Sequence, residues 1–146
     1  MGEQHQHLAA AGVLVAAAPV AVWWGVGDLS EDRTGLDYMM RAPDVAPGVV
    51  TVSGLVATAA VVVALAVLGR AFYRLRVDRA WLATPVLLAA AGALVAFGGR
   101  ILTAGVIGAN IGGGLFVLFG LPIAGAWVVA AGANAWSVCR RRPRAH

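Results

Sequence analysis

Four stretches without a charged residue constrain this chain more than any other feature of its sequence. They run from Leu8 to Gly27, from Val45 to Gly69, from Ala80 to Gly99 and from Ile101 to Cys139. An α-helix rises 1.5 Å per residue, so about 20 apolar residues cross the roughly 30 Å hydrocarbon core of a membrane. Only 12% of the residues are charged, against about 25% in soluble domains. The sequence therefore predicts an all-α membrane protein with a bundle of four transmembrane helices.

We expect these helices at residues 8–27, 47–68, 80–100 and 115–138 of one domain, residues 1–146. An outer loop, 28–46, and an inner loop, 70–79, connect them. The last run, Ile101 to Cys139, would be about 58 Å long as one helix, which is too long for one span and too short for two with a turn. Five glycines in its first part, at 105, 108 and 112–114, predict a glycine-rich break between the third and fourth helices.

The charged residues predict how the helices are oriented. Eight of the eleven arginines follow the second and fourth runs: Arg70, Arg74, Arg76, Arg79, Arg140, Arg141, Arg142 and Arg144. Arginine-rich segments mark the cytoplasmic side, whereas loop 28–46 holds five acidic residues against two arginines. We therefore expect both termini in the cytoplasm. The chain has no lysine, which favours a GC-rich bacterial genome. Together with the four predicted spans, this predicts a multi-pass protein of the bacterial cytoplasmic membrane.

The first run has a second interpretation, a cleaved signal peptide. The segment before it, Met1 to His7, contains Glu3 and neither Lys nor Arg, and signal peptides begin with positive charge. An uncleaved helix is therefore the expectation. Trp23 and Trp24 at its end are typical of residues that anchor a helix at the outer membrane interface.

Arg100 is the one charged residue within the apolar second half of the chain. Ionisable residues near the membrane core are candidates for function and need a partner. Because Asp28 and Asp44 flank the outer ends of the first two helices, they are its expected partners. Two interpretations remain. Either the Arg100 side chain extends to the membrane interface and pairs with these carboxylates, or it attracts an anion.

The segment from Gly108 to Gly114 contains a further candidate site. Gly108 and Gly112 form a GxxxG pattern, which lets two membrane helices approach closely. Asn110 adds an amide, whose burial in hydrocarbon without a partner is costly. The segment is therefore interpreted either as packing and turn structure or as a contact for an ion or substrate.

The outer loop is longer than a helical hairpin needs. Between Ser30 and Pro47 it mixes apolar with charged residues, with Leu36-Asp-Tyr-Met-Met40 between its charged ends, and this predicts a short interfacial helix. Tyr38, Met39 and Met40 would then face lipid or pack on the protein; recognition of a partner is the other interpretation.

No cofactor is expected. Cys139 is the only cysteine and the three histidines lie in the terminal segments, so neither a disulfide nor a haem site is predicted. Asp28, Glu31 and Asp32 could supply oxygen ligands to a divalent cation for a lipid-modifying enzyme, but their spacing matches no known loop pattern. The cytoplasmic arginines are expected to attract anionic lipid headgroups rather than nucleic acid.

Two known classes share the size of this chain. Small multidrug transporters use a carboxylate in the first helix, which is missing between Leu8 and Gly27. Fluoride channels are similar in length, in helix count and in a glycine-rich helix with an asparagine, here Asn110, Gly113, Phe116 and Gly120. Their first-helix glycine-arginine motif is missing, because Gly98-Gly-Arg100 lies in the third helix, so we do not assign the chain to that family.

The leading functional prediction is a non-enzymatic accessory or interaction protein that associates with itself or with a membrane partner through glycine-rich faces. The alternative is a small oligomeric transporter or channel for an anion, with Arg100 and Asn110 near its path.

Overall fold

The computed structural model describes residues 2–32, 34, 36–74 and 79–141, and within them every regular element is a helix. In chain order these are α1 (Gly2–Val26), α2 (Pro47–Tyr73), α3 (Arg79–Thr103), α4 (Ala109–Leu115), the π-helix η1 (Phe116–Gly120) and α5 (Leu121–Arg141). Gly27, with φ of 72°, ends α1 in the left-handed conformation that glycine adopts most easily. Pro47 begins α2 at a position where its missing N–H costs nothing.

Four helical stretches are long and apolar enough to cross a membrane: His5–Val26, Pro47–Tyr73, Arg79–Thr103 and Ala109–Arg140. The predicted all-α class and the four spans are thus confirmed. The fourth stretch joins α4, η1 and α5, and it begins at Ala109 rather than at the expected residue 115. Gly105 and Gly108 lie in the connection from α3, whereas Gly112, Gly113 and Gly114 are helical. The α2 helix also continues beyond residue 68 to Tyr73.

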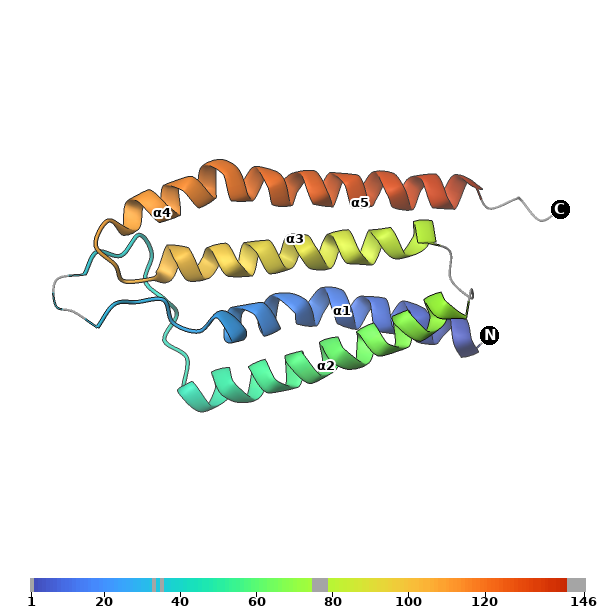
Figure 1. Cartoon of the computed structure of the whole chain (residues 1–146), viewed down its shortest axis with the longest axis horizontal. Coiled ribbons are helices and arrows are strands. Elements are labelled where there is room, and N and C mark those ends of the chain that lie inside the picture. The colour runs from blue at the N-terminus through green and yellow to red at the C-terminus, as the bar shows by residue number, and fades with distance from the viewer. Residues whose placement is uncertain (1, 33, 35, 75–78, 142–146) are drawn as a thin grey trace.

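The helices lie side by side in one open layer, in the order α2, α1, α3, α5 (Figure 1). The α1 helix packs on α2 and α3, and α3 packs on α1 and α5. The expected bundle is therefore a row in which α2 and α5 each have one main neighbour. In the most apolar 18-residue window of each span, only 17% of the residues are buried within the protein. The remaining apolar surface is available to lipid or to another protein.

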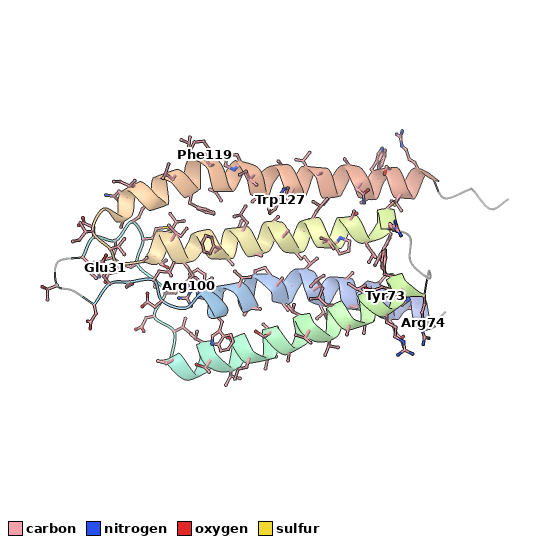
Figure 2. All side chains as sticks on the ribbon, in the orientation of Figure 1. Glu31, Tyr73, Arg74, Arg100, Phe119 and Trp127 are labelled. Atoms are coloured by element: carbon pink, nitrogen blue, oxygen red, sulfur yellow. The ribbon has the colours of Figure 1, made fainter. Side chains whose placement is uncertain are left out.

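The two ends of the layer differ. At the loop end, residues 27–46 fold next to the α3–α4 connection, residues 104–108 (Figure 1). At the terminal end lie the beginnings of α1 and α3 and the last turns of α2 and α5. Figure 2 shows Arg100 and Glu31 at the loop end and Tyr73 and Arg74 at the terminal end.

Small residues bring the helices close together. A core cluster of Ala10, Leu14, Ala64, Leu68 and Ala89 joins α1, α2 and α3. Elsewhere an aromatic ring fills the space above a glycine: Trp24 of α1 lies on Gly54 of α2, and Phe116 lies on Gly98 of α3. Trp23 and Trp24, expected as lipid-interface anchors, therefore pack on neighbouring helices.

The π-helix has a local cause in the sequence. A proline ring inside an α-helix clashes with the carbonyl four residues earlier and leaves one hydrogen bond unmade. Pro122 would place this clash at Leu118, which lies within η1. Widening the helix there relieves the clash, and the Leu121 N–H bonds to the Phe116 carbonyl five residues back. The kink expected at a proline takes the form of a π-bulge.

Candidate functional site

Arg100 joins α3 to the end of α1. Its Nε donates a hydrogen bond to the carbonyl oxygen of Trp23 at 2.7 Å, and its guanidinium carbon lies 4.3 Å from the centre of the Trp23 ring. Gly99 makes room for that ring, because a Cβ at Gly99 would lie 2.6 Å from it. The guanidinium is thus held by a charge-assisted hydrogen bond and a cation–π contact.

The hydrogen bond also completes the end of α1. The last carbonyls of a helix have no partner within the helix, and the Gly27 N–H bonds to Trp24 rather than to Trp23. Arg100 therefore supplies the donor that the Trp23 carbonyl lacks, and its positive charge lies at the negative end of the helix dipole.

Asp28 begins a tight turn beside this arginine. Its Oδ1 accepts hydrogen bonds from the Ser30 hydroxyl at 2.7 Å and from the Ser30 N–H at 3.0 Å. These two bonds lower the pKa of Asp28 below its usual 3.8; partial burial opposes the shift, and the charge of Arg100 adds to it. Asp28, one of the two predicted partners, thus acts on Arg100 through its electric field. Asp44 is exposed in the segment that leads to α2.

The loop between α1 and α2 is fixed to the α3–α4 connection through hydrogen bonds, most of them between backbone groups. The Gly105 N–H donates to the Ser30 hydroxyl at 2.9 Å, and the Gly105 carbonyl accepts from the Glu31 N–H at 2.8 Å. Farther along, the Val106 N–H donates to the Asp37 carbonyl and the Met40 N–H to the Leu102 carbonyl. Asp28, Ser30 and Gly105 therefore form one chain of hydrogen bonds across the loop end.

The predicted interfacial helix at residues 36–40 is wrong. This stretch is extended, and Asp37 forms an isolated antiparallel bridge with Val106. A helix would bond the stretch to itself, whereas here its backbone satisfies the exposed polar groups of the α3–α4 connection. The Tyr38 ring lies on Gly105, where a Cβ would be 2.6 Å from it, and the Met39 sulfur lies on Gly113. Tyr38 and Met39 therefore pack on the protein.

The residues of the GxxxG pattern have separate roles. Gly108 precedes α4 with φ of 77°, a conformation that favours glycine, so it is a turn residue rather than part of a helix face. Gly112 lies within α4, and a Cβ there would be 3.4 Å from Ile101 of α3. Asn110 is exposed in the first turn of α4. Arg100 and Asp28 come together at the loop end, whereas Gly108 forms the turn before α4 and Gly112 lies in α4 next to α3.

Sequence reasoning missed the polar link between α3 and α5. The Asn134 amide donates to the Ala80 carbonyl and, at 2.9 Å, to the Thr84 hydroxyl. An asparagine inside an apolar run was the available signal, since such a residue usually bonds to a neighbouring helix. This link holds the terminal end of α5 on α3.

Most hydroxyl groups on the spans are satisfied by their own helix. Thr51, Thr58 and Thr103 bond to carbonyls four residues earlier, and Ser53 and Ser137 to carbonyls three residues earlier. Among the described residues, no group of three or more His, Cys, Asp or Glu side chains could hold a metal ion.

A scan against protein-family models and searches of the curated proteins and the solved structures found no match for this chain.

The Asp28 turn predicts a dependence of stability on pH. Because the pKa of Asp28 is lower in the folded protein than in the unfolded chain, its contribution is present above about pH 3.8 and is lost as the pH falls through the folded value. The thermal midpoint of the wild type should exceed that of Asp28→Asn at pH 6, and the difference should shrink below pH 3.8. Asp44→Asn leaves the Ser30 bonds intact and should follow the wild type; a constant difference between wild type and Asp28→Asn would contradict the assignment.

Proposed function

We propose that this protein is a non-enzymatic accessory or interaction protein of the bacterial cytoplasmic membrane, with residues 28–46 outside and both termini in the cytoplasm. The open helix layer is the observation that supports this proposal most directly. Because only 17% of the residues in each apolar window are buried within the protein, much of the apolar surface, above all on the edge helices α2 and α5, must contact lipid or another membrane protein. The arginine-rich terminal end and the acidic loop end support the orientation.

The edge helix α5 offers the simplest contact for a partner. An added Cβ at Gly125 or Gly132 would meet no atom within 4 Å, and the two glycines lie seven residues apart, on one face of the helix. Small residues on such a face let a second helix approach closely. The partner is a membrane protein or a second copy of this chain.

Co-purification from native membranes in mild detergent, after crosslinking, tests this proposal. We expect the wild type to carry a partner or a second copy. Gly125→Leu with Gly132→Leu should reduce the crosslinked fraction about fivefold, equivalent to about 1 kcal/mol, because the leucines block close approach. Gly25→Leu on α1 also meets open space and is the matched control. A wild type that elutes as a monomer without any crosslinked species would disprove the proposal.

The same preparation tests the alternative, an oligomeric anion transporter. A row of four helices needs a second copy to enclose a path. If the protein purifies only as an oligomer of itself, anion flux into proteoliposomes should be measured for the wild type, Arg100→Ala and Asn110→Ala. Flux that both substitutions alter would favour transport over an accessory role.

A further inference from the structure

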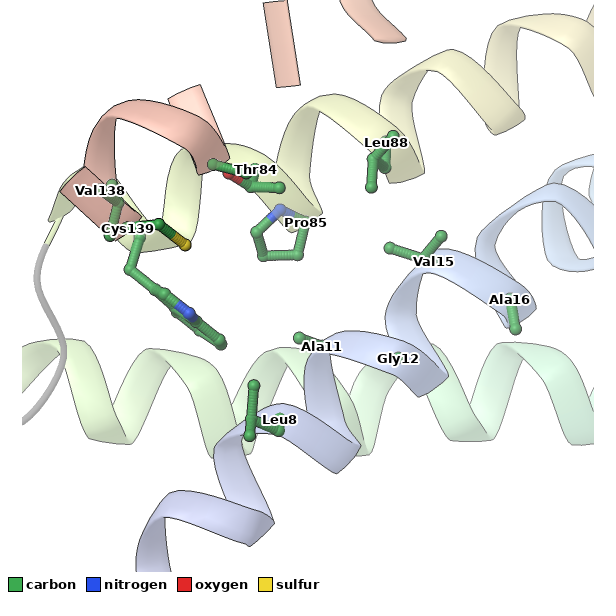
Figure 3. A pocket seen from close by; sticks show the side chains of 12 residues that line it. Leu8, Ala11, Gly12, Val15, Ala16, Thr84, Pro85, Leu88, Val138 and Cys139 are labelled. Carbon is green, nitrogen blue, oxygen red and sulfur yellow. The ribbon is translucent and has the colours of Figure 1, made fainter. Parts of the chain in front are cut away.

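A pocket of about 510 Å³ opens between α1, α3 and α5 near the terminal end (Figure 3). Its walls and floor are mainly apolar side chains, among them Leu8, Ala11 and Val15 of α1, Trp81 and Leu88 of α3, and Val138 of α5. Pockets of about 300–1,000 Å³ suit a small molecule. This volume therefore suits one flexible chain rather than a whole helix, which is at least about 10 Å wide.

The open layer explains why the pocket exists. The α1 and α5 helices pack on opposite sides of α3, which leaves α3 as the floor of a groove between them. The lining residues Ala11, Gly12 and Ala16 are too small to fill it. The one hydroxyl in the lining, that of Thr84, already accepts a hydrogen bond from Asn134. The groove thus offers an occupant mainly apolar contact.

Two arginines at the terminal end lie next to residues that line the pocket. Arg79 lies two residues before Trp81, and Arg140 directly follows Cys139, which also lines the pocket. Both arginines are exposed; their guanidinium groups lie over Phe72 and Trp136, at 5.4 and 4.6 Å from the ring centres. A ligand with an apolar chain and an anionic head matches both parts of the site.

We propose that this groove binds one anionic phospholipid. One acyl chain lies along α3 between α1 and α5, and the phosphate contacts Arg79 and Arg140 at the end of the groove. This inference goes beyond the accessory role proposed above and does not depend on it, because lipid binding is measured on the isolated protein.

Native mass spectrometry of the full chain in mild detergent tests the site, with phosphatidylglycerol and phosphatidylcholine of identical acyl chains as probes. The first phosphatidylglycerol adduct should form at about thirtyfold lower lipid concentration than the phosphatidylcholine adduct, because two arginines contribute about 1 kcal/mol each toward an anionic lipid. Arg79→Gln and Arg140→Gln should each reduce this preference. The phosphatidylcholine adduct should weaken less, because the choline group already balances the charge of its phosphate.

Gly12→Leu tests the groove itself. Gly12 lines the pocket, and a Cβ there meets no atom within 4 Å. Leucine at this position should weaken binding of both lipids about tenfold, because its side chain takes up space that the acyl chain needs. Gly25→Leu, on the same helix and also in open space, should bind like the wild type. Equal binding of both lipids by the wild type, or wild-type binding by Gly12→Leu, would overturn the proposal.

A measurement on the unaltered protein provides a second test. Cys139 is exposed and lines the pocket, so phosphatidylglycerol should slow its alkylation by N-ethylmaleimide several-fold more than phosphatidylcholine does. Equal alkylation rates in the two lipids would count against the site.

Discussion

Replacing Gly98 by leucine is expected to lower the free energy of unfolding by about 3 kcal/mol, the upper range for overpacking a close contact. The Phe116 ring occupies the place of a Cβ at Gly98. The ring cannot simply move away, because a Cβ at Gly120 would meet the same ring; Phe116 is thus enclosed between α3 and its own helix. The thermal midpoint in detergent and unfolding in graded denaturant measure the loss.

Gly25→Leu on α1 is the matched control, since an added Cβ there meets no atom within 4 Å and the protein should keep its wild-type midpoint. A double substitution gives a sharper test. Removing the ring with Phe116→Ala destabilises the protein by lost packing, but it should also abolish most of the cost of Gly98→Leu. The two effects should therefore be strongly non-additive, as expected for residues in contact. Additive effects would show that the clash lies elsewhere.

The spans could be predicted from the sequence, whereas their arrangement could not. Hydrocarbon length fixes how many apolar residues a span needs, and the charge-free runs meet that requirement. The order α2, α1, α3, α5 depends on which faces touch, and helices that are apolar on all sides carry no polar face to indicate it. The sequence shows where the glycines are. It does not show which ring packs on each one, because Trp24 and Phe116 come from distant parts of the chain.

The candidate site could be predicted only in part, again because contacts between distant parts of the chain leave no pattern in the sequence. Arg100 and Asp28 flank spans that end on the same side, so their proximity followed from topology. The Trp23 carbonyl that binds Arg100 is a backbone group, and no side-chain pattern marks it. The helix expected at residues 36–40 failed because the backbone of Gly105 and Val106 competes for the loop's hydrogen bonds. The helix propensity of residues 36–40 depends on those residues alone and gives no sign of a backbone partner about 70 residues away.

Arg100→Ala is expected to lower the free energy of unfolding by about 2 kcal/mol. Alanine removes a hydrogen bond from a charged donor, worth about 1.5–3 kcal/mol, and a cation–π contact, worth about 0.5–1 kcal/mol at an exposed site. Water at the end of the helix layer can hydrogen-bond to the freed groups, so the net loss is smaller than the sum. The Trp23 carbonyl loses its donor, so the last turn of α1 should fray. Trp23 emission, in a variant with the other four tryptophans replaced by phenylalanine, should shift as its ring loses the guanidinium.

Arg100→Lys separates charge from geometry. Lysine keeps the positive charge beside Asp28 but lacks the planar guanidinium that binds the carbonyl and lies over the ring, so it should recover less than half of the loss. Arg41→Ala is the matched control, because Arg41 is an exposed arginine of the loop-end segment and its removal should change stability by less than about 0.5 kcal/mol. If Arg100→Lys equals the wild type, net charge alone explains the role of Arg100. If Arg100→Ala equals Arg41→Ala, the link between α3 and α1 carries no stability, and an anion contact becomes the better account of this arginine.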